Sequence, residues 1–260
     1  MKSPADKQGS KTPLIEIKNL TKAFGSNQVL KGFDLQLFPG ENLVILGKSG
    51  SGKSVLIKCL IRLLEPDGGE IRVLGKLVVD LDQRALDRVR TDIGFLFQGS
   101  ALYDSMTVRE NLRFPLRRHP ERSGGGDEEE LILAALKSVG LADAIDLMPA
   151  ELSGGMKRRV ALARTLILKP KIVLYDEPTT GLDPITANEI IQLMLQLQQE
   201  LGTAAIIITH DMDCARVISN RVIILSDGIN YAEGTYQELA TAEDPKIKAF
   251  FKDVNARQHG

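Results

Sequence analysis

The chain has 260 residues, of which 43% are hydrophobic and 26% charged, and its formal net charge is −1. This size and composition are typical of one large globular α/β domain, or of one domain with an insert. The near-neutral charge gives no support for a nucleic-acid partner, and no apolar stretch reaches the about 18–20 residues of a membrane span.

The N-terminal part is predicted to contain a short lead-in followed by β-structure. Residues 1–13 are polar and contain no apolar signal core, so we expect a flexible N-terminus. Residues 14–46 alternate apolar and polar positions between turn signals, which predicts an antiparallel β subdomain. The apolar run at 43–46 then forms a buried strand, and a helical pattern covers 55–64.

A glycine-rich loop connects this strand to this helix. Such a loop lets consecutive backbone N–H groups point into one concavity at a helix N-terminus, where the helix dipole favours anions. Lys53 adds a cation for the β- and γ-phosphates, and the Ser54 hydroxyl can ligate Mg²⁺. The sequence therefore predicts a nucleoside triphosphate site formed by Gly47, Lys48, Ser49, Gly50, Ser51, Gly52, Lys53 and Ser54.

The rest of the chain alternates strands and helices, with one interruption. Apolar runs at 93–97, 172–175, 205–209 and 222–225 are typical of buried strands in a doubly wound α/β core. Residues from about 100 to 165 break the alternation and contain successive helical patterns. We therefore expect an inserted helical subdomain, with helices at 108–114, 128–139 and 154–168.

Two adjacent carboxylates, Asp176 and Glu177, follow the strand at 172–175. Open α/β sheets place their ligands at the carboxyl ends of strands. Asp176 would then face Mg²⁺, directly or through water, and Glu177 would polarise the attacking water as a general base. The alternative is a strand-end pair that only starts the turn at Pro178.

A second candidate anion site lies at a helix N-terminus, at Ser153, Gly154 and Gly155. One chain does not need two γ-phosphate sites on separate domains, whereas two chains arranged head to tail can each close the other's site. The segment Leu152 to Met156, with the helix after it, resembles the signature motif of ABC ATPases. The resemblance covers nearly all of residues 14–240.

This resemblance implies an α/β fold: a P-loop NTPase, ABC-type nucleotide-binding domain at 14–245, with an N-terminal antiparallel β subdomain and an inserted α-helical subdomain. Residues 246–260 would form a C-terminal tail. ATP and Mg²⁺ are the implied ligands, bound in sites shared between two copies of the chain.

Four further residues match landmarks of the family. Phe24 matches the aromatic residue that stacks on adenine, although an isolated Phe is more often part of a core. Gln98 matches the Q-loop, which links the Mg²⁺ and water site to the helical subdomain. Asp183 matches the D-loop, which crosses the dimer interface. His210 matches the switch histidine that contacts the γ-phosphate, although a single His after an apolar strand is usually structural.

One branch of the family fits particularly well. Most importer and exporter subunits end the signature in Gln, whereas this chain has Met156, so no role is transferred to that side chain. Together with residues 97–108 and 111–117, the variant signature resembles the Mla/Mkl branch, whose members are ATPases of phospholipid-trafficking systems built around MCE proteins. The branch implies a peripheral subunit on the cytoplasmic side of the inner membrane, bound to an MlaE-like permease and working with an MCE-domain lipid-binding protein.

The apolar segment after Gln98 suits a groove that receives a permease helix, but ordinary packing of the helical subdomain on the core also explains part of it. Two other functions remain open. An importer ATPase for amino acids, metals or other small solutes is one. A soluble ABC protein of DNA repair or translation is less compatible, because the sequence contains one cassette and only a short insert.

Overall fold

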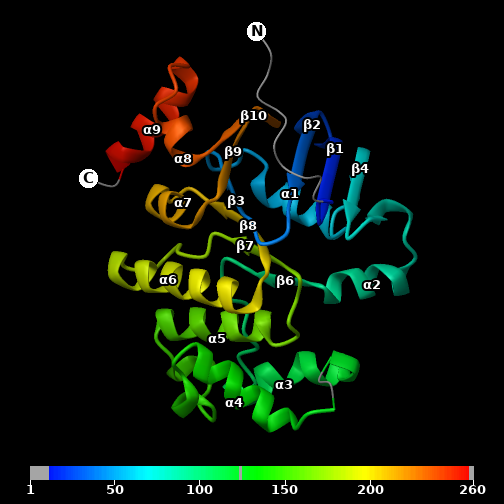
Figure 1. Ribbon diagram of the computed structural model, residues 1–260, viewed down its shortest axis with the longest axis vertical. Coiled ribbons are helices and arrows are strands. Elements are labelled where there is room, and N and C mark those ends of the chain that lie inside the picture. The colour runs from blue at the N-terminus through cyan, green and yellow to red at the C-terminus, as the bar shows by residue number, and fades with distance from the viewer. Residues whose placement is uncertain (1–11, 123–124, 258–260) are drawn as a thin grey trace.

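The computed structural model describes residues 12–122 and 125–257, and the predicted flexible N-terminus at 1–13 lies almost wholly outside these ranges. Two β-sheets organise the described chain (Figure 1). The first has the order β2-β1-β4-β5 and contains β1 (Ile15–Phe24), β2 (Asn27–Leu37), β4 (Gly68–Val73) and β5 (Lys76–Leu77). Its strands pair antiparallel. The alternating pattern of residues 14–46 predicted β1 and β2, whereas β4 and β5 lie outside that range.

The second sheet carries the predicted α/β core, in the order β10-β9-β3-β8-β7-β6. Its strands are β3 (Asn42–Leu46), β6 (Ile93–Leu96), β7 (Ile172–Asp176), β8 (Ala204–Thr209), β9 (Arg221–Ser226) and β10 (Ile229–Gly234). The five strands from β9 to β6 are parallel, and β10 pairs antiparallel with β9 at the edge. All five strands predicted from buried apolar runs are present, and each end lies within one residue of its predicted position.

The six-stranded sheet separates two hydrophobic cores, which explains why its strands are apolar at successive positions. Along β3, Leu43 and Ile45 join the core shared with the first sheet. Val44 and Leu46 point to the opposite face and join the core shared with the helical region.

Helices cover both faces of this sheet. They are α1 (Lys53–Leu60), α2 (Gln83–Thr91), α3 (Val108–Arg118), α4 (Glu128–Ser138), α5 (Gly154–Leu166), α6 (Pro184–Leu201), α7 (Met212–Ile218), α8 (Tyr236–Ala240) and α9 (Pro245–Arg257). In Figure 1, α3, α4 and α5 gather at the end of the molecule opposite the first sheet. None of the helices in the described ranges combines the length and apolar character that a membrane crossing requires.

The helix predicted at 55–64 differs from the observed one at both ends. It begins at Lys53 and ends at Leu60, because Arg62 adopts a left-handed backbone with φ 51° and the amide of Leu63 turns back to the carbonyl of Lys58 at 2.8 Å. Conversely, α3 runs four residues past its predicted end at 114. Although Pro115 lacks a backbone donor, Leu112 and Leu116 are buried on one face of this helix, and their packing outweighs that loss.

The stretch predicted as a C-terminal tail is mostly helical. Ile247, Phe250 and Phe251 of α9 are buried in the core of the helical face, and the ring centroids of Phe251 and Tyr236 lie 5.6 Å apart. The domain boundaries themselves stay a prediction.

Candidate functional site

The phosphate loop leaves the carboxyl end of β3, which lies between β8 and β9 in the sheet. Gly50 and Gly52 have φ of 78° and 103°, a region that favours glycine. A Cβ at Gly47 would lie 2.9 Å from the carbonyl oxygen of Leu225. Glycine at these positions therefore lets the loop turn closely against the sheet before α1 begins at Lys53.

Lys53 lies inside the concavity of this loop and is buried. Its Nζ donates to the carbonyl oxygens of Gly47 at 2.7 Å and Lys48 at 3.1 Å. Burial lowers the pKa of the ammonium, while the charges of Glu177 and Asp176 raise it. The cation is thus fixed by backbone carbonyls close to two carboxylates, where an anion would find it already in place.

Asp176 ends β7 and brings the first pair of predicted metal ligands together. The Ser54 hydroxyl donates to Asp176 Oδ1 at 3.5 Å. Burial, followed by the adjacent Glu177 charge, raises the pKa of the Asp176 carboxyl, while the Ser54 hydrogen bond and Lys53 oppose this. Two crowded carboxylates beside a hydroxyl are oxygen donors that suit Mg²⁺. In the described residues no group of three or more His, Cys, Asp or Glu side chains could hold a metal, so phosphate and water oxygens would have to complete the coordination.

Glu177 and His210 meet beside this pair. His210 Nδ1 lies 2.8 Å from Glu177 Oε2, and the Thr180 hydroxyl donates to the same oxygen at 3.2 Å. The Glu177 backbone is left-handed, with φ 52°, a strained conformation for a non-glycine residue. Its amide donates to the carbonyl of Ile208 on β8 at 2.9 Å, which helps to hold that conformation.

Gln98 and Phe24 are exposed and are less closely tied to the other predicted residues. The Gln98 side chain makes no hydrogen bond to the described residues, although its backbone carbonyl accepts one from Arg158. Phe24 is 48% exposed at the end of β1, and Lys22 Nζ lies 5.6 Å from its ring centroid. An exposed aromatic ring at a strand end can stack on a flat ligand, but the chain alone does not bring it to the carboxylates.

The second predicted anion site lies elsewhere on the chain. Ser153, Gly154, Gly155 and Asp183 line one pocket of about 420 Å³, which shares no lining residue with the phosphate loop. Ser153 accepts a hydrogen bond from the amide of Met156 and begins α5, while Asp183 accepts from the amides of Ile185 and Thr186 and begins α6. The structure therefore separates the predicted residues into two half-sites on one chain.

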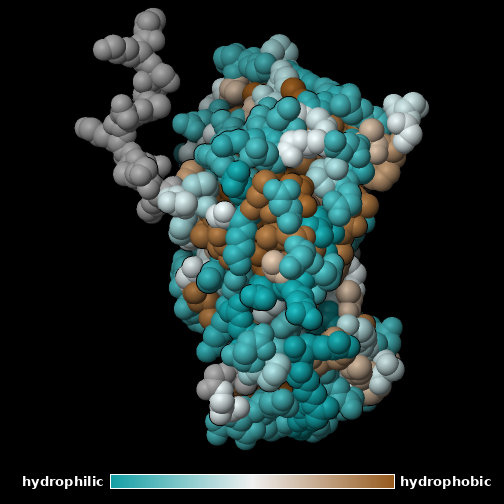
Figure 2. Space-filling view, turned by 90° about the vertical axis from the view of Figure 1, so that its right-hand side faces the viewer, coloured by the Kyte–Doolittle hydropathy of each residue, from teal (hydrophilic) through white to brown (hydrophobic). Residues whose placement is uncertain are grey.

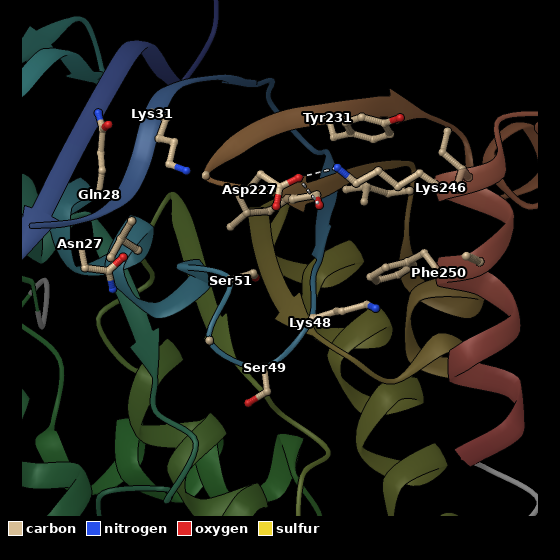
Figure 3. Close-up of a pocket in the computed structure, with 18 residues that line it drawn as sticks. Asn27, Gln28, Lys31, Lys48, Ser49, Ser51, Asp227, Tyr231, Lys246 and Phe250 are labelled. Atoms are coloured by element: carbon tan, nitrogen blue, oxygen red, sulfur yellow. Dashed lines mark hydrogen bonds and ion pairs between the residues drawn. The ribbon is translucent and has the colours of Figure 1, made fainter.

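A pocket of about 460 Å³ borders the first half of the phosphate loop (Figure 3). Its walls include Lys48, Ser49, Gly50 and Ser51, together with β2, the β9–β10 turn and α9. Figure 3 shows Lys246 extending from α9 toward Asp227, and Lys246 Nζ donates to that carboxylate at 2.5 Å. Sequence reasoning missed this wall, because nothing local in the start of α9 shows that Lys246 to Phe250 lie beside the loop.

Sequence reasoning also missed Arg158 and Thr180. Arg158 donates to the Gln98 carbonyl and Thr180 donates to the Glu177 carboxylate, so both contact predicted site residues directly. Arg158 lies between Lys157 and Arg159, so the sequence did not distinguish it from its charged neighbours. Thr180 carried no signal beyond its place three residues after Glu177.

Comparison with known proteins agrees with this geometry. The family model described as "ABC transporter" matches residues 30–180. The chain is 38% identical over 242 residues to "Intermembrane phospholipid transport system ATP-binding protein MlaF" of Haemophilus influenzae, covering 92% of this chain and 90% of that protein. It is 36% identical over 246 residues to "Probable ribonucleotide transport ATP-binding protein mkl" of Mycobacterium leprae, covering 95% of this chain and 70% of that protein.

Two further similarities bear on the function. The chain is 37% identical over 243 residues to "Methionine import ATP-binding protein MetN" of Brucella abortus, covering 92% of this chain and 65% of that protein. Among solved structures, the dimeric post-hydrolysis state of the ATP-binding cassette MJ0796, bound to ADP and Pi, matches with a TM-score of 0.76 and 35% identity, covering 85% of this chain and 98% of that one.

These matches confirm the predicted fold, and the MlaF and Mkl similarities confirm the predicted Mla/Mkl branch. With a family match over more than half of its length and a phosphate loop facing paired carboxylates, the chain belongs to the ABC transporter family, as an ATP-hydrolysing subunit.

Proposed function

We propose that this chain powers phospholipid transport through a separate integral permease, from the cytoplasmic side of the inner membrane and together with an MCE-domain lipid-binding protein. The observation that carries the proposal is the similarity to MlaF over 90% of that protein's length. The geometry supports it as well, because Ser54 meets Asp176 and His210 meets Glu177 near the carboxyl ends of β7 and β8.

Each group has a proposed part in hydrolysis. The loop amides and Lys53 hold the phosphates, and the pocket beside the first half of the loop gives room for the base and sugar. The exposed ring of Phe24 would stack on the base. Ser54, Asp176 and Gln98 hold Mg²⁺, which neutralises phosphate charge when bound. Glu177 accepts a proton from the attacking water, because its carboxylate is 12% exposed and oriented by two hydrogen bonds. His210 is 65% exposed and so is free to contact the γ-phosphate.

Two copies of the chain share two ATP molecules in this proposal. The half-site of Ser153, Gly154, Gly155 and Asp183 has no phosphate loop of its own and would complete the site of the other copy. The dimeric state of the similar cassette MJ0796 supports the arrangement. A homodimer also places two equivalent docking segments beside one permease.

The permease would dock on the segment after Gln98, and the structure narrows the residues available for contact. Val108 is fully buried and Leu102 is half-buried against the core, so ordinary packing accounts for both. Phe97 and Tyr103 remain 41% and 43% exposed. Figure 2 shows one face of the molecule, which is mainly hydrophilic with hydrophobic side chains gathered at its middle.

The experiment that tests the proposal is purification of the tagged chain from membranes in mild detergent, with Tyr103→Asp compared with Val217→Asp. Both changes place a charge at a partly exposed apolar residue, but Val217 lies on α7. We expect a permease and an MCE-domain protein to co-purify with the parent chain and with Val217→Asp, and to be lost with Tyr103→Asp. Recovery of the same partners with Tyr103→Asp would reject this docking surface.

A small-solute importer is the alternative, and the similarity to MetN favours it. Deletion in the source organism separates the two functions. A phospholipid transporter predicts altered envelope lipid distribution and detergent resistance. Normal lipid behaviour with loss of uptake of one small solute, and co-purification of a solute-binding protein, would support the importer.

A further inference from the structure

Arg158 connects three segments that meet at the proposed site. It lies in the second turn of α5 and is 4% exposed. Its guanidinium donates to the carbonyl oxygens of Phe97 at 3.0 Å and Gln98 at 2.6 Å, in the segment after β6. A third hydrogen bond, at 3.3 Å, reaches the carbonyl oxygen of Thr180, in the turn after β7.

This side chain is an unusual choice for packing alone. Arg158 makes no ion pair in the part of the chain that the structure describes, its Nε has no hydrogen-bond partner, and burial lowers the pKa of its guanidinium. Burial of a cation with no carboxylate partner is costly, and only the backbone carbonyls offset that cost here. An apolar side chain would fill the same space without this cost. We therefore attribute to the arginine a specific task, which is to orient these carbonyls.

The third carbonyl leads directly to the proposed general base. Thr180, whose carbonyl oxygen accepts from Arg158, donates its own hydroxyl to Glu177 Oε2 at 3.2 Å and its amide to the Glu177 carbonyl at 3.3 Å. Glu177 has a strained, left-handed backbone. Such a conformation persists only where its surroundings fix it, so a fixed Thr180 contributes to the orientation of the carboxylate.

We propose that Arg158 is a positioning residue for ATP hydrolysis: its one guanidinium fixes the backbone at Gln98 and, through Thr180, the carboxylate of Glu177 relative to the helix that carries the signature residues. This inference rests on the proposed role of Glu177 as general base. It adds that the two segments are held in register by α5, which belongs to the other half-site of the same chain.

The test uses the full chain with Arg158→Gln and Arg158→Lys, and Arg72→Gln as a matched control whose side chain is 42% exposed on the first sheet. We expect Arg158→Gln to lower kcat by about tenfold or more while KM for ATP changes by less than about twofold. The hydrogen bonds of Arg158 run to the Gln98 and Thr180 segments and not to the phosphate loop or Lys53, so the groups that hold the phosphates stay in place while the proposed base does not. Arg158→Lys, which keeps the charge and one or two of the hydrogen bonds, should recover part of kcat. Arg72→Gln should behave as the parent chain.

Thr180→Val tests the second half of the connection without removing the arginine. It keeps the backbone carbonyl that Arg158 binds but removes the hydroxyl that donates a hydrogen bond to Glu177. The value of kcat should therefore again fall by several-fold, with KM little changed. Thr241→Val, at a hydroxyl that bonds only within its own helical turn, is the control. If the Arg158 variants fail to fold in melting experiments, normal kcat in Thr180→Val would still overturn the proposal, because the connection from Arg158 to Glu177 runs through Thr180.

A double-mutant cycle separates positioning from general loss of structure. Once Glu177→Gln has removed the base, Arg158→Gln should cause a much smaller further loss in residual turnover than it causes in the parent chain, since the carboxylate that it positions is gone and only its effect on the Gln98 backbone remains. An equal loss in both backgrounds, or normal kcat in Thr180→Val, would overturn the proposal. Normal turnover of Glu177→Gln itself would instead reject the proposed base, so the two failures are distinguishable.

Discussion

Exchange of Glu177 for Gln should stop turnover while leaving the folded chain and its affinity for ATP nearly unchanged. The amide keeps the shape of the side chain but cannot accept a proton from water. Loss of a general base lowers the rate by about 10²-fold or more, equivalent to about 2.7 kcal/mol in activation free energy. ATP should therefore bind and not be hydrolysed, and two chains should accumulate as an ATP-bound dimer.

The effect on stability should be small, and the contacts of Glu177 indicate why. The carboxylate accepts hydrogen bonds from His210 and Thr180 at the same oxygen, Oε2, and an amide oxygen in that position can keep both. His210 is 65% exposed, so the lost charge interaction is screened by solvent. Removal of the Glu177 charge also relieves its repulsion of Asp176, whose pKa it raises. We expect a net change in the free energy of unfolding of less than about 1 kcal/mol.

Glu41→Gln is the matched control, because the Glu41 side chain is also 12% exposed. Its two oxygens accept from Arg221 at 2.7 and 3.0 Å, and from the amide of Phe38 at 2.9 Å. In the Gln variant, an NH₂ group replaces one of these acceptor oxygens. That group would face the N–H donors of Arg221 or Phe38, and the hydrogen bond there would be lost. We expect a loss of about 2 kcal/mol in unfolding free energy, a fall of about 4–8 °C in melting temperature for a chain of this size, with kcat unchanged.

The assay combines melting curves, steady-state ATP hydrolysis and size-exclusion chromatography with Mg-ATP on the two variants. The two variants should change opposite properties. Glu177→Gln should lose turnover and keep its stability, while Glu41→Gln should lose stability and keep its turnover. Near-normal hydrolysis by Glu177→Gln would refute the assignment of the base. A large drop in its melting temperature would refute the argument that its contacts are screened.

Three further predictions follow from the same geometry. Lys53→Ala removes the cation held by the Gly47 and Lys48 carbonyls, so Mg-ATP should no longer raise the melting temperature and turnover should be lost; a thermal shift equal to that of the parent chain would contradict this. Gly155→Ala places a Cβ 2.7 Å from the Thr186 Cγ2 atom, so α5 and α6 must shift; ATP binding to the single chain should persist while hydrolysis, measured at dimer-forming concentrations, falls by about tenfold or more. Without Mg²⁺, burial and then the Glu177 charge raise the pKa of Asp176, so the folded chain holds this proton more tightly than the unfolded one. The resulting stabilisation is present below the ordinary pKa of 3.8 and declines as the pH rises through the raised value; Asp176→Asn should remove that decline from melting curves recorded at several pH values.

The parts of the fold that could be predicted are those that depend on a pattern of neighbouring residues in the sequence. The strands of the central sheet are buried on both faces, so each is a short apolar run, and the phosphate loop is a local pattern with a fixed backbone consequence. Helix ends were less accurate. The early end of α1 depends on the left-handed backbone of Arg62. The side chain of Arg62 donates to the carbonyls of Val78 and Leu81, and no local sequence pattern predicts those contacts.

The candidate site shows the same division. Ser54 and Asp176 are 122 positions apart, yet both could be predicted because each ends a strand or loop at the same edge of the sheet. Arg158 and Thr180 could not, because their function depends on backbone carbonyls and on a side-chain hydroxyl, which any sequence could supply. The wall that α9 provides for the pocket beside the phosphate loop depends on Lys246 meeting Asp227, a contact between residues that are individually ordinary.

The contacts of α5 connect the proposed ATP site to the proposed permease-docking segment. Arg158 holds the carbonyls of Phe97 and Gln98, and six residues later Arg164 donates to those of Ser100 and Ala101 at 3.2 and 2.8 Å. Ser100 and Ala101 both have positive φ, 62° and 48°, so this segment would not keep its shape without such partners. The helix that begins with the signature residues therefore fixes the proposed docking segment by two arginines. If two chains close around ATP and move α5, we expect the segment to move with it as one unit, because separating them would break four hydrogen bonds to two arginine side chains, of which Arg158 is buried.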